Sequence, residues 1–242
     1  MTIHVGIVSS GRAKNVPKMT EMVGDAVWYV GHGEGDAYRD AGAARVVESG
    51  NLMDSRNAVL EDAFAAGLAA IQLSDDLTRL RIVTDDKQAT PIPFERAVEF
   101  LKYACASTGA RLAGIAPVDN PFYTDPTKPI KTEHFILGDF MYVEPSTPRF
   151  DTALRLKEDY DFTAQHLFTY GRVARCDIIL GGFQHRTNAG GAVAYRDETV
   201  EQEAIATLRS KWGAAIVDNT KRENEILFRG RKVLEMREAT NG

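Results

Sequence analysis

The stretch from Ser55 to Leu77 constrains the fold more than any other part of the chain. Apolar residues recur at helical spacing after Ser55, Gly67 ends this pattern, and an apolar run follows that closes on Asp75 and Asp76. The order helix, tight turn and buried strand is typical of α/β proteins, whose ligands bind outside the carboxyl ends of the strands. Hard oxygen ligands suit Mg²⁺ and Mn²⁺, so the adjacent carboxylates predict a metal-bridged nucleotide site.

The composition is that of a globular protein with one large domain. The 242 residues are 44% hydrophobic and 26% charged, and no apolar run is long enough to span a bilayer, so we expect a soluble, cytoplasmic protein without a membrane partner. The net charge of -5 argues against nonspecific polyanion binding, because that affinity comes from cationic side chains. The sequence is still compatible with a local basic face at 128–131, 221–222 or 229–232.

Strand patterns alternate with helix patterns in the first half of the chain. This alternation predicts an α/β fold with a Rossmann-like, mostly parallel central sheet and helices on both faces. Ser55 is a reasonable N-cap for its helix and Gly67 a reasonable terminator. The expected strands are Ile3 to Ser9, Ala26 to Val30, Ala44 to Glu48, Ala69 to Leu73, Leu80 to Thr84 and Arg111 to Ile115, with helices from Ser55 to Ala66 and from Phe94 to Ser107.

The second half is less regular. A proline-rich segment from Asp119 to Lys131 predicts a long loop, and loops of this length are often lids or acceptor-facing segments. A glycine-rich polar loop is expected at 181–191. The remaining expected elements are strands from His134 to Val143, Ile178 to Leu180, Ala215 to Val217 and Ile226 to Phe228, and helices from Asp159 to Tyr170 and Glu198 to Trp212.

Two groups of polar residues lie where strands are expected to end. Ser9-Ser10-Gly11-Arg12 follows the first strand, where backbone amides, hydroxyls and Arg12 suit a nucleotide; the alternative is a surface turn with a solvated arginine. For the acidic pair, we expect Asp76 to coordinate the metal directly and Asp75 to contact a ribose or a metal-bound water. The alternative is a turn acid. Asp85-Asp86 is a weaker competitor that has the features of an exposed turn.

Ser55-Arg56-Asn57, the alanine-rich helix and Leu73-Ser74-Asp75-Asp76 resemble the Arg-Asn helix and acidic strand end of GT-A glycosyltransferases. Ser74 stands where these enzymes have the first Asp of Asp-x-Asp. The resemblance implies a single GT-A domain over 1–242, with a nucleotide-sugar half at about 1–115 and an acceptor half at about 116–242. It implies donor contacts from Ser9, Ser10, Gly11, Arg12, Trp28, Val30, Glu34, Arg56, Asn57 and Asp75, and Mn²⁺ or Mg²⁺ held by Asp76 and His185.

The segment Lys157-Glu158-Asp159-Tyr160-Asp161-Phe162 resembles the Glu-Asp element that carries the general base of inverting GT-A enzymes. Asp159 is the expected base: its carboxylate would take the proton of the attacking hydroxyl while the metal stabilises the departing diphosphate. Helix capping is the alternative, and it suits Asp159 and Asp161 equally well. His185 resembles the late histidine that completes the metal shell, although an isolated loop histidine is more often structural.

The whole set of motifs is most similar to the TET/JBP-associated glycosyltransferases, a family linked with bacteriophage DNA hypermodification. The motifs include Ser-Gly-Arg-x-x-x-x-Pro-Lys-Met, Ser-Asp-Asp-Leu, Lys-Glu-Asp-Tyr-Asp and Thr-Asn-Ala-Gly-Gly. This resemblance implies transfer of a sugar from a UDP-sugar to the hydroxyl of a hydroxymethylated pyrimidine in DNA, in the host cytoplasm if the protein is phage-encoded.

Three other functions remain open. A GT-A enzyme that acts on a glycan or small molecule would keep the same donor half and change only the loops at 119–131 and 182–191. Gly11-Arg12 with Pro17-Lys18 resembles the first loop of sugar nucleotidyltransferases, but the second glycine and the usual spacing are missing. A non-enzymatic nucleotide-binding module would not need both Asp76 and Asp159.

Overall fold

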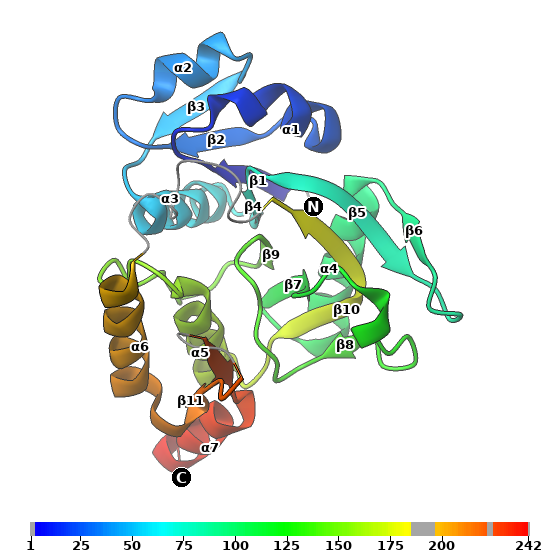
Figure 1. Cartoon of the computed structure of the whole chain (residues 1–242), viewed down its shortest axis with the longest axis vertical. Helices are drawn as coiled ribbons and strands as arrows, with labels where there is room; N and C mark the ends of the chain where they lie inside the picture. The colour runs from blue at the N-terminus through cyan, green and yellow to red at the C-terminus, as the bar shows by residue number, and fades with distance from the viewer. Residues whose placement is uncertain (1–2, 185–196, 222–224, 242) are drawn as a thin grey trace.

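The computed structural model describes residues 3–184, 197–221 and 225–241 (Figure 1). A ten-stranded sheet has the order β3-β2-β1-β4-β9-β7-β10-β5-β6, with β8 paired to β10, and a small second sheet pairs β11 with β12. Among the described residues no helix is long and apolar enough to cross a membrane. The strands are β1 (Ile3–Val8), β2 (Val27–Val30), β3 (Arg45–Glu48), β4 (Ala69–Ser74), β5 (Leu77–Val83), β6 (Ala89–Pro91), β7 (Leu112–Ala116), β8 (Ile130–Lys131), β9 (Phe140–Val143), β10 (Ala174–Phe183), β11 (Ile216–Asp218) and β12 (Ile226–Phe228).

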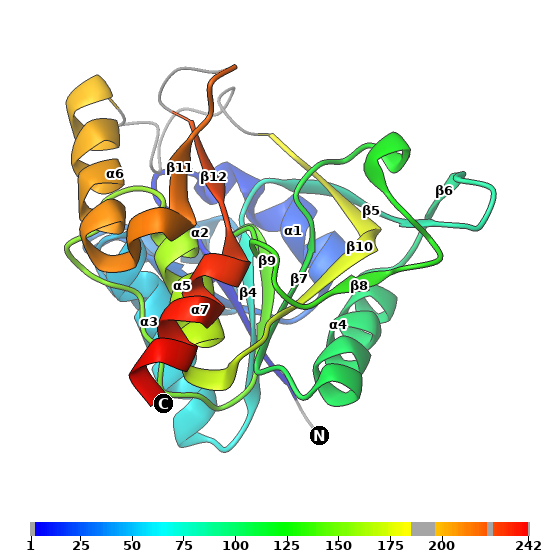
Figure 2. The ribbon, with the colours of Figure 1, turned by 90° about the horizontal axis from the view of Figure 1, so that it is seen from below.

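Helices cover both faces of the large sheet, as the sequence predicts. Figure 2 shows α1 and α4 on one side of it and α3, α5 and α7 on the other. The helices are α1 (Val16–Val23), α2 (Gly35–Asp40), α3 (Leu52–Ala65), α4 (Phe94–Thr108), α5 (Glu158–Tyr170), α6 (Glu198–Trp212) and α7 (Gly230–Asn241), with 3-10 turns η1 (Ala13–Asn15), η2 (Pro121–Tyr123) and η4 (Gly213–Ala215).

Strand directions bring several strand ends together at one edge of the sheet. β1 pairs in parallel with β2 and β4, and β2 with β3. β9 lies antiparallel between β4 and β7, so β4 and β7 run in the same direction. β10 is parallel to β7, whereas β5 and β6 form an antiparallel border. The carboxyl ends of β1, β2, β4, β7 and β10 therefore share one edge, the place where open α/β sheets bind ligands.

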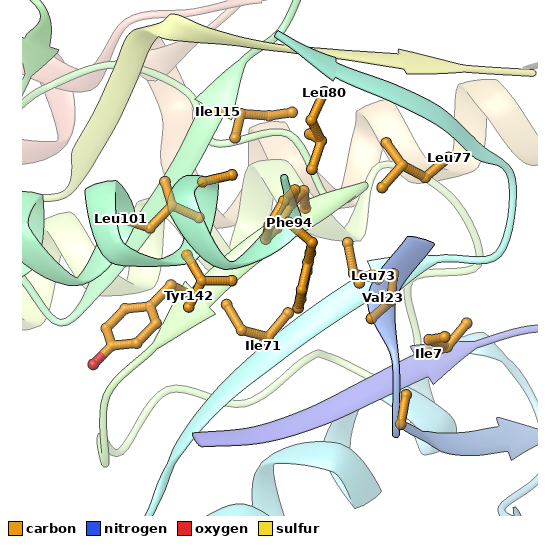
Figure 3. Packing of buried hydrophobic residues seen from close by; sticks show 14 of the residues in the cluster. Ile7, Val23, Ile71, Leu73, Leu77, Leu80, Phe94, Leu101, Ile115 and Tyr142 are labelled. Carbon is orange, nitrogen blue, oxygen red and sulfur yellow. The ribbon is translucent and has the colours of Figure 1, made fainter. Parts of the chain in front are cut away.

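Side chains alternate between two apolar cores, one on each face of the sheet. On β2, Trp28 and Val30 belong to the core formed with α1 and α4, whereas Val27 and Tyr29 belong to the core formed with α3 and α5. Figure 3 shows the first core, where Phe94 of α4 lies among side chains of the central strands. This period of two is the pattern of strands buried on both faces.

Two predicted boundaries around α3 have different outcomes. The helix begins at Leu52, because Asn51 is the N-cap and its side chain accepts hydrogen bonds from the backbone amides of Met53 (2.9 Å) and Asp54 (3.2 Å). The prediction of Ser55 as N-cap is therefore wrong: Ser55 is buried inside the helix. The predicted end is confirmed, since Gly67 has a φ of 68° just after the last turn.

Two predicted strands have different lengths in the structure. The strand expected over His134 to Val143 covers only Phe140–Val143, because the chain turns at Gly138 and Asp139. β10 extends through Gly181 and Gly182 into the predicted glycine-rich loop. A Cβ on Gly181 would lie 2.6 Å from Ile115 Cδ1, so a glycine is needed there for close packing within the sheet.

Gly6 on β1 lets α3 approach the sheet. A Cβ at this position would lie 2.6 and 2.7 Å from the two γ-methyl groups of Val59. We expect Gly6→Ala to lower the free energy of unfolding by about 1–3 kcal/mol, measured by urea denaturation. Val59→Ala removes both methyl groups. In the double variant, the loss of unfolding free energy should be smaller than the sum of the losses in the two single variants. An additive loss would show that Gly6 is not needed for the contact with Val59.

Candidate active site

The loops after β1 and β4 meet through buried polar contacts. Ser9 Oγ donates a hydrogen bond to Asp75 and lies 2.5 Å from the hydroxyl oxygen of Tyr38. Arg12 Nη1 is 2.7 Å from Asp75 Oδ1 and 3.8 Å from Asp76 Oδ2. The structure therefore brings the predicted residues Ser9, Arg12, Asp75 and Asp76 together at one edge of the sheet.

Glu34 joins the loop after β1 to the loop after β2. Its carboxylate accepts hydrogen bonds from Ser10 Oγ (2.9 Å), from the Gly11 backbone amide (3.0 Å) and from the Gly31 backbone amide (3.3 Å). Ser10, Gly11 and Glu34 are thus neighbours, and their contact with a donor stays a prediction. Because the Glu34 carboxylate binds these three protein groups, it stabilises the two loops in this structure.

Tyr38 belongs to this site although sequence reasoning does not select it. Its hydroxyl accepts a hydrogen bond from the Arg12 backbone amide (3.1 Å) and lies beside Ser9, and its side chain is 1% exposed. Burial raises the pKa of Tyr38, so the phenol stays protonated. A single tyrosine on the short helix α2 has the features of a core residue, and only the tertiary structure reveals its hydrogen bonds.

Burial raises the pKa of Asp75 to about 6, against the opposing effects of Arg12 and the Ser9 hydroxyl. Asp75 is 2% exposed and Asp76 is 6% exposed, so two carboxylates share a largely buried position. At pH values above about 6 Asp75 is therefore available as an anion. Arg12 supplies a compensating positive charge beside them, which is the arrangement that a buried acidic pair requires.

The acidic pair fits a divalent cation that arrives with substrate phosphates. Mg²⁺ is usually bound by one or two carboxylates and completes its shell with waters and phosphate oxygens. Among residues 3–184, 197–221 and 225–241 no group of three or more His, Cys, Asp or Glu could hold a metal, and Asp75 and Asp76 are the carboxylates that this edge offers to one. The predicted ligand His185 lies outside the described residues. The competitor Asp86 accepts hydrogen bonds from its own exposed turn, as predicted.

A second polar cluster surrounds the start of α5. Asp159 Oδ2 accepts a hydrogen bond from the Gly138 backbone amide (3.1 Å). Arg56 Nη1 donates to the Gly138 carbonyl (2.9 Å), and Arg56 Nε lies 3.1 Å from Glu158 Oε1. A Cβ on Gly138 would lie 2.7 Å from Arg56 Nη2, so a larger residue there would displace the Arg56 guanidinium.

Burial and the neighbouring negative charge of Glu158 raise the pKa of Asp159 to about 7, although the Gly138 amide and Arg56 act in the opposite direction. A general base works best when its pKa lies near the working pH. The surroundings of Asp159 therefore suit proton abstraction at neutral pH.

Neither acid is the N-cap of α5, although Asp159 Oδ1 accepts a hydrogen bond from the Tyr160 backbone amide (3.0 Å) in the first turn. The N-cap is Lys157, which has a φ of 60° and makes no side-chain capping bond. Asp161 has 0% exposure and accepts hydrogen bonds from Trp212 Nε1 (2.8 Å) and Gln165 Nε2 (2.7 Å), with Lys211 Nζ 2.6 Å away. Asp161 thus joins α5 to α6 inside the protein, and Asp159 is the acid of the pair that faces the turn at Gly138.

One turn connects the two clusters. Asp139 accepts hydrogen bonds from Ser74 at both its backbone carbonyl (2.9 Å) and its side chain (3.0 Å), while the preceding Gly138 binds Asp159. Ser74 is directly followed by Asp75. Sequence reasoning missed Gly138 and Asp139 because they were placed inside a strand; a Gly-Asp pair after an apolar run is a turn signal that could have identified them.

The side chains of four residues expected at the donor pack against other parts of the protein. Those of Trp28 and Val30 are 2% and 0% exposed in the core, so only their backbone could reach a donor, and this contact stays a prediction. Arg56 is also buried, against Gly138 and Glu158. Asn57 uses its amide to donate to the Phe150 carbonyl and to accept from the Phe150 amide, both at 2.9 Å. Arg56 and Asn57 therefore stabilise the segments around Gly138 and Phe150.

Comparisons with known proteins bear on the fold. No protein-family model and no curated protein matches the chain. Among solved structures, S. aureus TarS 1-349 in complex with UDP-GlcNAc is similar with a TM-score of 0.56 and 13% identity, over 97% of this chain and 70% of that one. A mannose-1-phosphate geranyltransferase from Thermus thermophilus covers 75% of this chain and 57% of its own at 10% identity, but its TM-score of 0.34 is too low to support an argument. The likeness to TarS and the sheet described above show that the chain has the α/β fold of a GT-A glycosyltransferase.

Proposed function

We propose that the protein is a metal-dependent glycosyltransferase that moves a sugar from a UDP-sugar to the hydroxyl of a 5-hydroxymethylpyrimidine in DNA. The observation that carries this proposal is the turn at Gly138 and Asp139, which binds Asp159 on one side and Ser74, next to the acidic pair, on the other. A base and a phosphate-binding edge at neighbouring positions are what transfer to a hydroxyl requires.

The donor half would use the edge formed by β1, β2 and β4. The backbone and hydroxyl groups of Ser9 to Gly11 would hold the nucleotide, and Arg12 would pair with its phosphates. Asp76, with Asp75, would hold Mn²⁺ or Mg²⁺, which supplies charge stabilisation to the leaving diphosphate. TarS, which shares the fold, binds UDP-GlcNAc in its crystal structure, and this supports a nucleotide-sugar as the donor.

Asp159 would act on the acceptor. As the acceptor oxygen bonds to the anomeric carbon, the bond from that carbon to UDP breaks, UDP leaves with the electron pair, and Asp159 takes the hydroxyl proton. A single displacement of this kind inverts the anomeric configuration. A product that keeps the donor configuration would argue against Asp159 as the base.

The acceptor assignment is supported by the motif resemblance to the TET/JBP-associated glycosyltransferases. It is tested by incubating the protein with Mn²⁺, a panel of UDP-sugars and duplex DNA that contains 5-hydroxymethylcytosine or 5-hydroxymethyluracil, followed by intact-mass and nucleoside analysis. We expect a hexose- or N-acetylhexosamine-sized gain on the modified nucleoside and none on unmodified DNA. If the mass of the modified nucleoside did not increase while UDP-sugar binding was still measurable, the acceptor would be a glycan or small molecule instead of DNA. Pyrophosphate release from UTP and a sugar phosphate would instead indicate a nucleotidyltransferase.

A further inference from the structure

The loop after β7 exposes aromatic side chains at the same edge of the sheet as the acidic pair. Five large hydrophobic side chains are exposed in the described part of the chain, and three of them, Val118 (48%), Phe122 (75%) and Tyr123 (71%), lie in this loop. Figure 2 shows the loop between β7 and β8 on the side of the molecule where β5 leads into β6. Exposed apolar groups that gather in this way mark interaction sites.

Both ends of the loop are fixed to the sheet. The Asp119 carboxylate lies 2.6 Å from Arg79 Nη2 and 2.5 Å from Arg81 Nη2, which ties the loop to β5. At the other end the Pro129 carbonyl accepts a hydrogen bond from the Asp177 backbone amide (2.8 Å). The loop is therefore an ordered projection that is anchored to β5 and β10.

The apex of the loop is also ordered. Asn120 Oδ1 accepts a hydrogen bond from the Phe122 amide (3.0 Å), and Thr124 Oγ1 donates to the Pro121 carbonyl (2.7 Å). The rings of Phe122 and Tyr123 lie 5.3 Å apart, centre to centre, at 90° to one another. Because the turn fixes the backbone that carries the two rings, little backbone ordering is left to oppose binding.

We propose that Phe122 and Tyr123 form the acceptor platform, on which the base of a nucleotide in the acceptor strand stacks; this inference rests on the proposed function. Every base has a flat π face, and stacking on an aromatic side chain needs only an accessible ring. The local charge suits a phosphodiester strand. Strand β5 and residues 117–131 together have an excess of positive charge, in a chain of net charge -5: the cations are Arg79, Arg81, Lys128 and Lys131, and the anions are Asp119 and Asp125.

The platform is tested with the double variant Phe122→Ala/Tyr123→Ala. Both side chains are exposed, so the fold should be unaffected. We expect the double variant to bind a fluorescently labelled hydroxymethylcytosine oligonucleotide about ten-fold or more weakly by anisotropy, because stacking stabilises each base by about 1–3 kcal/mol. UDP-sugar affinity in Mn²⁺ should not change. Tyr103→Ala, which removes a 63% exposed tyrosine from α4, is the matched control and should bind DNA as the wild type does.

An unchanged dissociation constant in the double variant would overturn the platform, and so would a wild-type protein that does not bind the oligonucleotide. Phe122→Trp, which keeps a ring at the position, should retain affinity. Failure of the wild type to bind UDP-sugar would count against the donor half of the proposed function, and calorimetry separates that result from a failure of the platform.

Discussion

Asp159→Asn is expected to abolish sugar transfer while UDP-sugar binding stays close to that of the wild type. The amide oxygen can still accept the hydrogen bond of the Gly138 amide, so the turn at the acceptor side should persist. The amide cannot take the hydroxyl proton, and loss of a general base typically lowers the rate by about 10²–10⁴-fold. The measurement is kcat on hydroxymethylated DNA, with donor affinity from calorimetry. Full activity in the variant would leave Asp159 with a structural role only.

The pH dependence provides a second test of the same residue. Burial and Glu158 raise the pKa of Asp159 from its ordinary value of 3.8 to about 7, so the folded protein holds this proton more tightly than the unfolded chain does. The free energy of unfolding should therefore fall as the pH rises from about 4 through about 7. In the same range kcat should rise, because Asp159 becomes the free base.

The Asp159→Asn variant separates this effect from that of Asp75, whose pKa is also raised, to about 6. Urea denaturation at about pH 5 and about pH 8 should show a smaller loss of stability in the variant than in the wild type. At the higher pH the variant should be the more stable protein. An equal loss of stability in both would mean that Asp159 titrates as an ordinary exposed acid.

The grouping of Ser9, Arg12, Asp75 and Asp76 at one edge could be predicted from the sequence because these residues directly follow strands. Short apolar runs that end in Ser9 to Arg12 and in Asp75-Asp76 are visible in the sequence, and parallel strands bring their carboxyl ends to one edge. Trp28 and Val30 show the limit of this reasoning. Helices on both faces of the sheet imply that both side chains are buried, as they are against α1 and α4, so their place at the donor came from the family resemblance alone.

The acceptor side depends on contacts between distant parts of the chain. Arg56 and Gly138 are 82 residues apart, and no local pattern predicts that a buried guanidinium binds the carbonyl of that turn. The position of the antiparallel strand β9 between β4 and β7 also has no local sequence signal. This position places Asp139 beside Ser74, although the sequence of β9 is that of an ordinary apolar strand. Asp159 could be selected only through the family resemblance.

Asp76→Asn is expected to remove the effect of metal on donor binding. The carboxylate lies 3.8 Å from Arg12 and is 6% exposed, so an amide of the same shape keeps the packing but lacks the charge that a divalent cation needs. In Mn²⁺ the affinity for UDP-sugar should fall by roughly 10–100-fold, as expected when a charge-assisted contact is lost. Titration calorimetry with and without EDTA measures the change.

The matched control is Asp86→Asn, which makes the same chemical change on the exposed turn after β5 and should leave donor affinity unaltered. In EDTA the wild type and Asp76→Asn should bind the donor equally weakly, because neither then has the cation that links carboxylate and diphosphate. If Asp76→Asn kept its affinity in Mn²⁺, the acidic pair would serve only to hold Arg12 and Ser9 in place. The phosphates would then have to be neutralised by Arg12 itself.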